Sequence, residues 1–376
     1  MIELGEILLS NDDNFFLLKG LSSSKINEIK EVINLANDFC SKVVIPRVHK
    51  YEIQIDKNPD FLPSDFIHEA NRWQLFSKWL PKAFGGGGFS PLSMHFFNEI
   101  LASHCMAMTN MIGVHYVGLT ALSASMNYKM LQNVCKKIKA GEKKSTPHTL
   151  SIAVTEPEAG TDLEDHKLLK NAKVGCTLIK SDGGYTLNGT KIFISNGHLS
   201  HWSIVTAFLD KNSPHTSQVS VLVSKDSPGF SHGKIERKLG QKSCTASELI
   251  FDNVFISADN VIFSKDHCPA NLDFEETAKT FTADVLNLSR TGVGSIATGI
   301  SKSALDLSLK YCREQKINGV LMGQIEWVQI KLAKMHNNIY LSRNITFDSL
   351  LANDYWGPFK EMSAPVTSFF MKKVER

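Results

Sequence analysis

Two short segments of the chain bring together hydroxyl groups, an aromatic ring and glycine-containing turns. Residues 154–162 read VTEPEAGTD, so a β-branched run ends at Thr155 and leads into a turn. Residues 189–197 read GTKIFISNG and place Phe193 two positions before the hydroxyl of Ser195. Hydroxyl and free N–H groups at a strand end can bind a polar ligand, and an aromatic ring can cover a planar one. Taken alone, each segment is more typical of a capped turn and a core aromatic residue.

Taken together, the two segments resemble the flavin-binding signature of the acyl-CoA dehydrogenase family. The same resemblance extends along the chain, to LPKAFGG at residues 80–86, KLGQKS at 238–243, FDNV at 251–254 and SRTGVGSIATGISKSALD at 289–306. It therefore runs nearly from end to end, with gaps. Such coverage implies that the fold of the family is shared as well as one binding motif.

Hydrophobic patterning divides the chain into three regions. A helix capped within Ser22-Ser23-Ser24 is expected near the N-terminus. Short β-branched runs, among them residues 172–179, begin after Pro147, with a hairpin turn at residues 182–184. Helical patterns return after Asn271. We predict an α+β fold with an N-terminal α-helical domain at 1–146, a middle β-barrel or β-sandwich domain at 147–264, and a shortened C-terminal α-helical bundle at 265–376.

Composition excludes several classes of protein. The formal net charge is only +3, and no basic stripe interleaved with aromatic residues indicates nucleic-acid binding. The seven cysteines are scattered without a CxxC spacing, which argues against a zinc site and favours reduced thiols in the cytoplasm. No apolar run is long enough to cross a bilayer, and the acidic N-terminal residues do not fit a signal peptide. We expect a cytoplasmic protein that binds neither metal, membrane nor nucleic acid.

The family resemblance implies FAD as the cofactor and gives roles to residues at matching positions. The cofactor-binding residues that it implies are Ile152, Ala153, Val154, Thr155, Gly160, Thr161, Phe193, Ile194 and Ser195. The substrate-binding residues that it implies are Thr161, Lys242, Ser289 and Arg290. Arg290 matches a family arginine near the phosphopantetheine or nucleotide part of the substrate, but an ordinary surface salt bridge explains it equally well. Lys242 stands where the family has arginine and keeps only the charge.

The catalytic base of the family has no counterpart at the expected positions. The family removes an α-proton with a glutamate, which must lie about 3 Å from that proton, while a hydride leaves for the flavin. In most members this glutamate lies beyond the point that corresponds to Arg376, where residues 371–376 read as part of a helix. In a minority it directly precedes the helix arginine, where this chain has Ser289. The catalytic residue is therefore left open.

A second departure concerns the segment that in this family contacts the adenine and pyrophosphate of FAD across a subunit interface. The family pattern R-x-x-F-G…Q is replaced by Gln315, Asn318-Gly319 and Glu326. Loss of an arginine near a pyrophosphate removes a charge-assisted contact of about 1.5–3 kcal/mol. We therefore expect FAD to bind more weakly without this arginine, though binding need not be lost.

The two segments that resemble the flavin-binding signature are intact, while the usual catalytic base is absent. This combination favours altered chemistry over a general loss of function. Short members of the family resemble carrier-protein-dependent flavin dehydrogenases that form aminomalonyl or hydroxymalonyl units for polyketide–peptide assembly. These enzymes oxidise an aldehyde, as its hydrate, on a carrier-protein thioester, so the proton leaves a hydroxyl group. We predict a seryl-derived aldehyde as substrate, an acyl carrier protein and an upstream alcohol dehydrogenase as partners, and a homodimer.

Three other hypotheses remain open: a conventional acyl-CoA dehydrogenase, a flavin-dependent monooxygenase of the same fold, and a non-catalytic binding subunit. A colourless purified protein would favour the last of these. A basic run could dock an acidic carrier protein, although such runs are more often solvated loops. Its residues are Lys136, Lys137, Lys139, Lys143 and Lys144.

Overall fold

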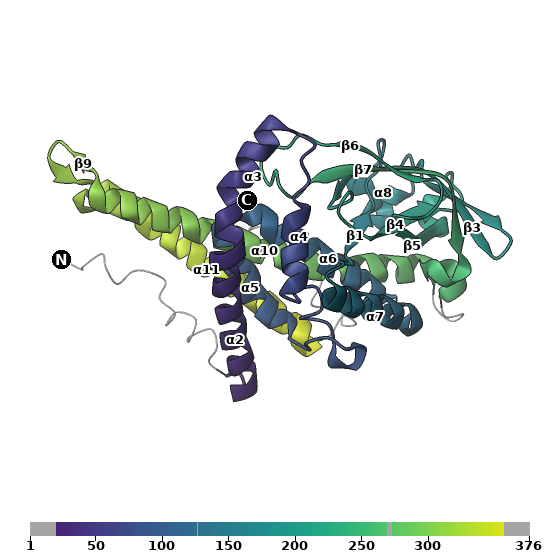
Figure 1. Ribbon diagram of the computed structural model, residues 1–376, viewed down its shortest axis with the longest axis horizontal. Coiled ribbons are helices and arrows are strands. Elements are labelled where there is room, and N and C mark those ends of the chain that lie inside the picture. The colour runs from purple at the N-terminus through teal and green to yellow at the C-terminus, as the bar shows by residue number, and fades with distance from the viewer. Residues whose placement is uncertain (1–19, 126, 269–272, 357–376) are drawn as a thin grey trace. The chain divides into compact units, whose positions relative to one another are not determined.

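The computed structural model describes residues 20–125, 127–268 and 273–356 (Figure 1). Contacts within the chain divide it into two compact units. Unit 1 consists of Met1–Val48, Phe89–Thr109 and Arg290–Arg376, and unit 2 of His49–Gly88 and Asn110–Ser289. In the described residues, no helix combines the length and the apolar character needed to cross a bilayer.

The sequence explains where two helices of unit 1 begin. Helix α2 (Ser23–Phe39) starts as predicted, since the Ser22 hydroxyl accepts from the Lys25 N–H at 3.3 Å. Helix α5 (Pro91–His104) has proline at its first position. The Glu28 carboxylate of α2 accepts from the backbone N–H and the hydroxyl of Ser90, just before α5, at 2.6 and 2.7 Å. The two helices are thereby joined where α5 begins.

Two long helices complete unit 1. The later part of α10 (Phe274–Glu314) runs beside α11 (Glu326–Trp356), and a hairpin of β9 (Lys316–Ile317) and β10 (Val320–Leu321) joins them (Figure 1). Asn318 and Gly319 both have positive φ, +49° and +83°, as a two-residue hairpin turn of type I′ requires. Buried side chains between the helices are Leu305, Leu309, Cys312, Val328, Leu332 and Ile339.

Unit 2 contains an eight-stranded sheet and several helices. Its helices are α4 (Ser64–Arg72), α7 (Tyr128–Lys144), and the short α8 (His166–Leu169) and α9 (Pro214–Ser217). Helices α3 (Ile45–Lys57), α6 (Met106–Ala124) and α10 belong partly to unit 2 and partly to unit 1, and the part of α10 up to Ser289 belongs to unit 2. The strands are β1 (Leu150–Ala153), β2 (Thr177–Ser181), β3 (Gly184–Ser195), β4 (Trp202–Phe208), β5 (Gln218–Ser224), β6 (Phe230–Ile235), β7 (Ala246–Ser257) and β8 (Val261–Phe263). Their order is β6-β7-β3-β2-β4-β5-β8, and β1 pairs in parallel with β4.

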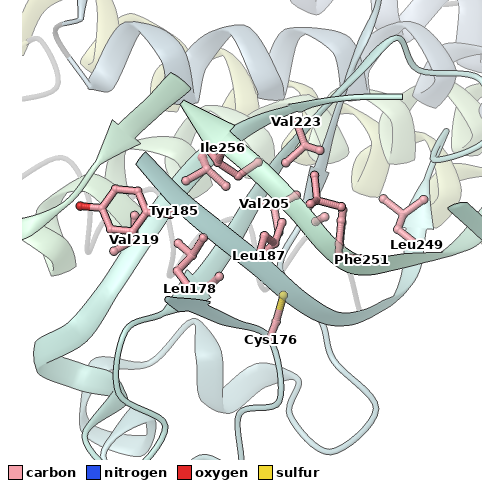
Figure 2. Packing of buried hydrophobic residues seen from close by; sticks show 14 of the residues in the cluster. Cys176, Leu178, Tyr185, Leu187, Val205, Val219, Val223, Leu249, Phe251 and Ile256 are labelled. Atoms are coloured by element: carbon pink, nitrogen blue, oxygen red, sulfur yellow. The ribbon is translucent and has the colours of Figure 1, made fainter. Parts of the chain in front are cut away.

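The sheet folds over onto itself to make its core. Inward side chains of β3 and β7, such as Leu187 and Phe251, pack in one cluster with those of β4 and β5, such as Val205 and Val219 (Figure 2). This two-sided core agrees with the predicted β-barrel or β-sandwich type. The α+β fold with helical regions on either side of a β-region along the chain is thus confirmed. The three predicted domain boundaries stay a prediction.

Most predicted β-runs form strands, and one of them begins late. The hairpin at residues 182–184 joins β2 and β3 as expected. Residues 172–179 are one of the β-branched runs expected to form a strand, but the chain becomes extended only at Thr177. Ala172 and Val174 instead bury their side chains in a separate cluster with Leu163 and Leu169, so this stretch packs as a covering loop. The helix expected at residues 371–376 lies outside the described residues.

A buried histidine connects α6 to the start of the sheet. The side chain of His115 is 0% exposed, and its Nε2 lies 2.9 Å from the carbonyl of Phe76. Its Nδ1 accepts from the N–H of Leu150, the first residue of β1, at 3.2 Å. Only the neutral ring can accept at Nδ1 while donating at Nε2. Burial lowers the pKa of His115 from 6.5 to about 4.

Acidification should therefore destabilise the protein through His115. In the unfolded chain His115 is protonated below about pH 6.5, whereas in the folded chain it is protonated only below about pH 4. The free energy of unfolding therefore falls as the pH falls from 6.5 to 4. The expected loss is about 1.4 kcal/mol per pH unit, or about 2 kcal/mol between pH 6.5 and 5. Urea unfolding at several pH values would measure it. In His115→Gln the free energy of unfolding should fall by about 2 kcal/mol less between pH 6.5 and 5. An unchanged dependence on pH would show that His115 is not the group responsible.

Candidate functional site

A bulge near the end of β3 turns Phe193 away from the core. Lys191 pairs with Leu249 of β7 and Ile194 with Ser247, so β3 carries one residue more than its partner between these pairs. Phe193 adopts a positive φ of +60°, which is unusual for an aromatic residue. Its side chain is 55% exposed, whereas Ile194 beside it is buried. Such bulges often re-aim a side chain next to a functional site.

A buried ion pair holds the other segment against this bulge. The Lys191 ammonium donates to the carbonyl of Val154 and to the Glu156 carboxylate, both at 2.7 Å. The side chains of Lys191 and Glu156 are 0% and 1% exposed. The backbone N–H of Ile192 also donates to the carbonyl of Thr155 at 3.0 Å. The two segments that sequence analysis paired are thus bonded directly to each other.

A cavity of about 360 Å³ opens beside these segments, entirely within unit 2. This volume is typical of a small-molecule site. Strand residues in its wall are Ile152, Val154, Thr155, Phe193, Ile194, Ser195, Ile204, Thr206, Gln218 and Ser220. Helix residues in its wall are Asn110, Val114, Val117 and Ala121 of α6, and Phe281, Thr282, Val285, Leu286 and Ser289 of α10. Leu163 and Glu164 complete it.

The cavity combines apolar walls with uncharged hydroxyl and amide groups. In the part of the chain that the structure describes, the hydroxyls of Thr155 and Ser195 have no protein hydrogen-bond partner. Glu164 is the one charged residue in the wall, and it lies at an exposed position. The wall can therefore bind a planar, largely apolar group whose polar edge meets two hydroxyls.

Seven of the predicted site residues line this cavity. They are Ile152, Val154, Thr155, Phe193, Ile194, Ser195 and Ser289. Ala153 alternates to the opposite side of β1 and is fully buried in the sheet core. Gly160 and Thr161 lie outside the cavity wall, and Thr161 is exposed. A Cβ at Gly160 would meet no atom within 4 Å, so that turn borders open space.

The two predicted cationic substrate residues are not in the cavity wall. Lys242 donates to Asp56 of α3 at 3.0 Å and lies 3.8 Å from Glu52. Its hydrogen bond and charge interaction with Asp56 raise its pKa. Arg290 is the residue after Ser289 on α10 and is half-buried. Their roles in substrate binding stay predictions.

Sequence analysis missed several polar residues of the cavity. Thr206 and Ser220 are cross-strand partners, and Gln218 lies two residues before Ser220 on the same face of β5. Alternation along β4 and β5 could have shown polar residues on one face, but only the pairing of the strands brings them together. Gln218 is 6% exposed, and within the described residues its amide has no protein partner, so it faces the cavity as an available polar group.

Comparison with known proteins decides the family. Residues 27–142, 151–254 and 280–373 match the models of the acyl-CoA dehydrogenase N-terminal, middle and C-terminal domains, respectively. The chain belongs to the acyl-CoA dehydrogenase family. The matched middle domain contains both segments of the cavity wall from which sequence analysis started.

Relatives within the family cover most of the chain. It is 27% identical over 347 residues to acryloyl-CoA reductase (NADH) of Anaerotignum propionicum, covering 92% of this chain and 82% of that protein. The fold is similar to glutaryl-CoA dehydrogenase of Mycobacterium smegmatis in complex with FADH2, with a TM-score of 0.76, 19% identity and coverage of 98% and 84%. It is also similar to the prolyl acyl carrier protein oxidase AnaB, with a TM-score of 0.73, 20% identity and coverage of 94% and 86%.

Members of this family bind FAD, and the cavity wall has groups that fit its ring system. Phe193 offers an exposed aromatic face, and the hydroxyls of Thr155 and Ser195 are available for a polar edge. The apolar residues of α6 and α10 bound the remaining space. These groups suit the ring system of a flavin better than a phosphate group, because the wall contains no cationic side chain.

Proposed function

We propose that this protein is an FAD-dependent dehydrogenase that oxidises an acyl thioester tethered to a carrier protein. The substrate that we favour is a seryl-derived aldehyde, which becomes an aminomalonyl thioester. The observation that carries the proposal is the character of the cavity wall. The hydroxyl and amide groups of the wall lie at buried or half-buried positions. The one carboxylate of the wall, Glu164, lies at an exposed position.

This wall suits a substrate whose acidic proton is bound to oxygen. Bound FAD would supply a two-electron acceptor for a hydride. An aldehyde hydrate loses that hydride from carbon and one proton from a hydroxyl group, and becomes a carboxylic acid. Water or the exposed Glu164 can accept such a proton. No buried base at an α-carbon is needed, which agrees with Ser289 at one position where the family can carry a glutamate.

A protein of similar fold supports the proposal that the substrate is bound to a carrier protein. AnaB is a prolyl acyl carrier protein oxidase, so this fold accommodates a substrate on a carrier protein in at least that case. On this chain, the exposed lysines Lys136, Lys143 and Lys144 of α7 offer a basic surface for an acidic carrier. Lys139 is not available for this purpose because its ammonium donates to the Glu142 carboxylate at 3.0 Å.

Mass spectrometry of the carrier protein tests the proposed function. Seryl-carrier protein would be incubated with an alcohol dehydrogenase that forms the aldehyde, and then with this protein and FAD. The expected product carries one oxygen atom more than the aldehyde. A carrier that stays at the aldehyde mass would overturn the proposal. Parallel reactions with pantetheine thioesters would show whether turnover depends on the carrier itself.

Conventional acyl-CoA dehydrogenation is the second candidate, favoured by the CoA substrates in the names of the sequence relatives. Glu164 would then be the cavity carboxylate available as base in the described residues. On our proposal, Glu164→Gln should lower kcat less than tenfold because solvent can accept a hydroxyl proton. A loss of a hundredfold or more, typical of a missing general base, would favour the second candidate. Steady-state kinetics with both substrate types would decide.

We also propose that the protein forms a homodimer through unit 1. Leu307 and Tyr311 of α10 are 66% and 57% exposed, and Trp327 and Leu341 of α11 are 54% and 56% exposed. Large apolar side chains exposed on both of these helices favour a protein–protein contact there. Light scattering should give about twice the chain mass of 41.8 kDa. A monomer at micromolar concentration, with FAD bound, would contradict the dimer.

A further inference from the structure

An asparagine in the cavity wall is oriented by a chain of hydrogen bonds. Asn110 lies on α6, and its Nδ2 donates to Gln241 Oε1 at 3.0 Å and to Cys244 Sγ at 3.5 Å. A side-chain amide nitrogen has two hydrogens, so these contacts use both of them. The Oδ1 atom is left as the polar atom of Asn110 that can face a ligand. In the described part of the chain no protein group donates to it.

The orientation of this amide is fixed by residues beyond its direct contacts. Asn196 Nδ2 donates to the carbonyl of Met111 at 2.8 Å, which leaves Asn196 Oδ1 as an acceptor. The Cys244 thiol donates to that oxygen at 3.8 Å. Cys244 has then used its hydrogen, so its sulfur can only accept from Asn110. Reversing the Asn110 amide would set its oxygen against the sulfur lone pairs and lose this contact.

The space beside the free oxygen is open. Gly113 lies one turn further along α6, and a Cβ built there would meet only Asn110 Oδ1 within contact range, at 4.0 Å. On the other side, Gln241 has a positive φ of +51°, a strained conformation for a residue with a side chain. Strain of this kind is retained where surrounding contacts require it, and here the side chain meets Asn110.

We infer that Asn110 Oδ1 selects substrates that carry an N–H or O–H donor on the acyl group within the cavity. The inference rests on the proposed function only in placing an acyl group there. An α-amino group, as in a seryl-derived substrate, is a donor of this kind and would make a charge-assisted hydrogen bond when protonated. An unsubstituted acyl chain would leave Oδ1 without a partner once water is displaced, which costs affinity.

Binding of three matched ligands tests the inference without turnover. Propionyl, alanyl and lactyl groups have the same skeleton and differ only in the α-substituent, and each would be joined to pantetheine through an amide that cannot be hydrolysed. Calorimetry on the FAD-loaded protein gives the ratio of alanyl or lactyl affinity to propionyl affinity. In Asn110→Leu, which removes the acceptor, this ratio should fall by a factor of roughly ten to a hundred relative to the unchanged protein.

Two further variants keep the test decisive. Asn110→Asp retains an acceptor oxygen and should keep the preference, with alanyl gaining over lactyl because of its charge. Thr120→Val alters α6 at a hydroxyl that bonds only the Tyr116 carbonyl within the described residues and lies outside the cavity wall, so it should leave all three affinities unchanged. An unchanged ratio in Asn110→Leu, or failure of all three ligands to bind, would overturn the inference. Failure of the proposed function alone would appear as normal binding without oxidation of the carrier-bound substrate.

Discussion

Lys191→Met is expected to destabilise the protein by about 3–5 kcal/mol and to strip it of FAD. The substitution would leave the Glu156 carboxylate buried without its counter-charge, a change that typically has this cost. It would also release the Val154 carbonyl, which precedes Thr155 in the cavity wall. The free energy of unfolding of a typical domain is only about 5–15 kcal/mol, so a loss of this size would unfold a measurable fraction of the protein.

Urea unfolding and the ratio of flavin to protein absorbance measure the two effects of Lys191→Met. An exposed ion pair provides the matched control. Lys173 lies 4.0 Å from Glu158, and the two side chains are 82% and 71% exposed. Lys173→Met should change stability by less than about 1 kcal/mol, because exposed pairs contribute little. Equal effects of the two substitutions would show that the Lys191–Glu156 pair does not hold the site together.

Arg343→Leu should have an effect of similar size in unit 1. Arg343 of α11 forms a two-point ion pair with Glu99 of α5, in which its Nε lies 3.0 Å from one carboxylate oxygen and its Nη2 contacts the other. The side chains are only 4% and 7% exposed. Nearby, the Nδ1 of His95 lies 2.7 Å from the Ser295 hydroxyl, and burial lowers the pKa of His95 to about 4. While Arg343 is present the histidine is therefore neutral at pH 7, and Arg343 is the counter-charge of Glu99.

The expected loss of stability for Arg343→Leu is about 3–5 kcal/mol, measured by urea unfolding. The double variant Glu99→Leu with Arg343→Leu should recover part of it, because no unpaired charge then remains buried. Lys42→Leu removes one partner of an exposed pair with Asp38 and should be nearly neutral. A double variant as unstable as the sum of two severe single variants would contradict this explanation.

The two segments of the cavity wall could be found in the sequence. The contacts that hold them together could not. Thr155, Phe193 and Ser195 could be chosen from residue type and motif, because hydroxyls and an aromatic ring at strand ends are local features. The exposure of Phe193 depends on the bulge between β3 and β7, and therefore on strand pairing that no local pattern encodes. The role of Lys191 was missed for a similar reason, since its partner Glu156 lies in the other segment.

Residues on the helical wall were harder to predict. Asn110 lies in an apolar stretch of α6 whose pattern indicates only a packed helix. Its hydrogen-bond partners Gln241 and Cys244 are 131 and 134 residues away along the chain. The orientation of the Asn110 amide depends on Gln241, Cys244 and Asn196, which are far from it in the sequence. No pattern of residue spacing in the sequence indicates such a set of contacts. Lys242 shows the opposite case, because a family position suggested a ligand contact where the structure has an ion pair with Asp56.

Anaerobic reduction of the bound flavin tests the central claim most directly. The FAD-loaded protein would be mixed, without oxygen, with carrier protein bearing the seryl-derived aldehyde or with an unsubstituted acyl-CoA. The carrier-bound aldehyde should bleach the flavin stoichiometrically, and the acyl-CoA should leave its absorbance unchanged. Bleaching by the acyl-CoA with no response to the carrier-bound aldehyde would contradict the account.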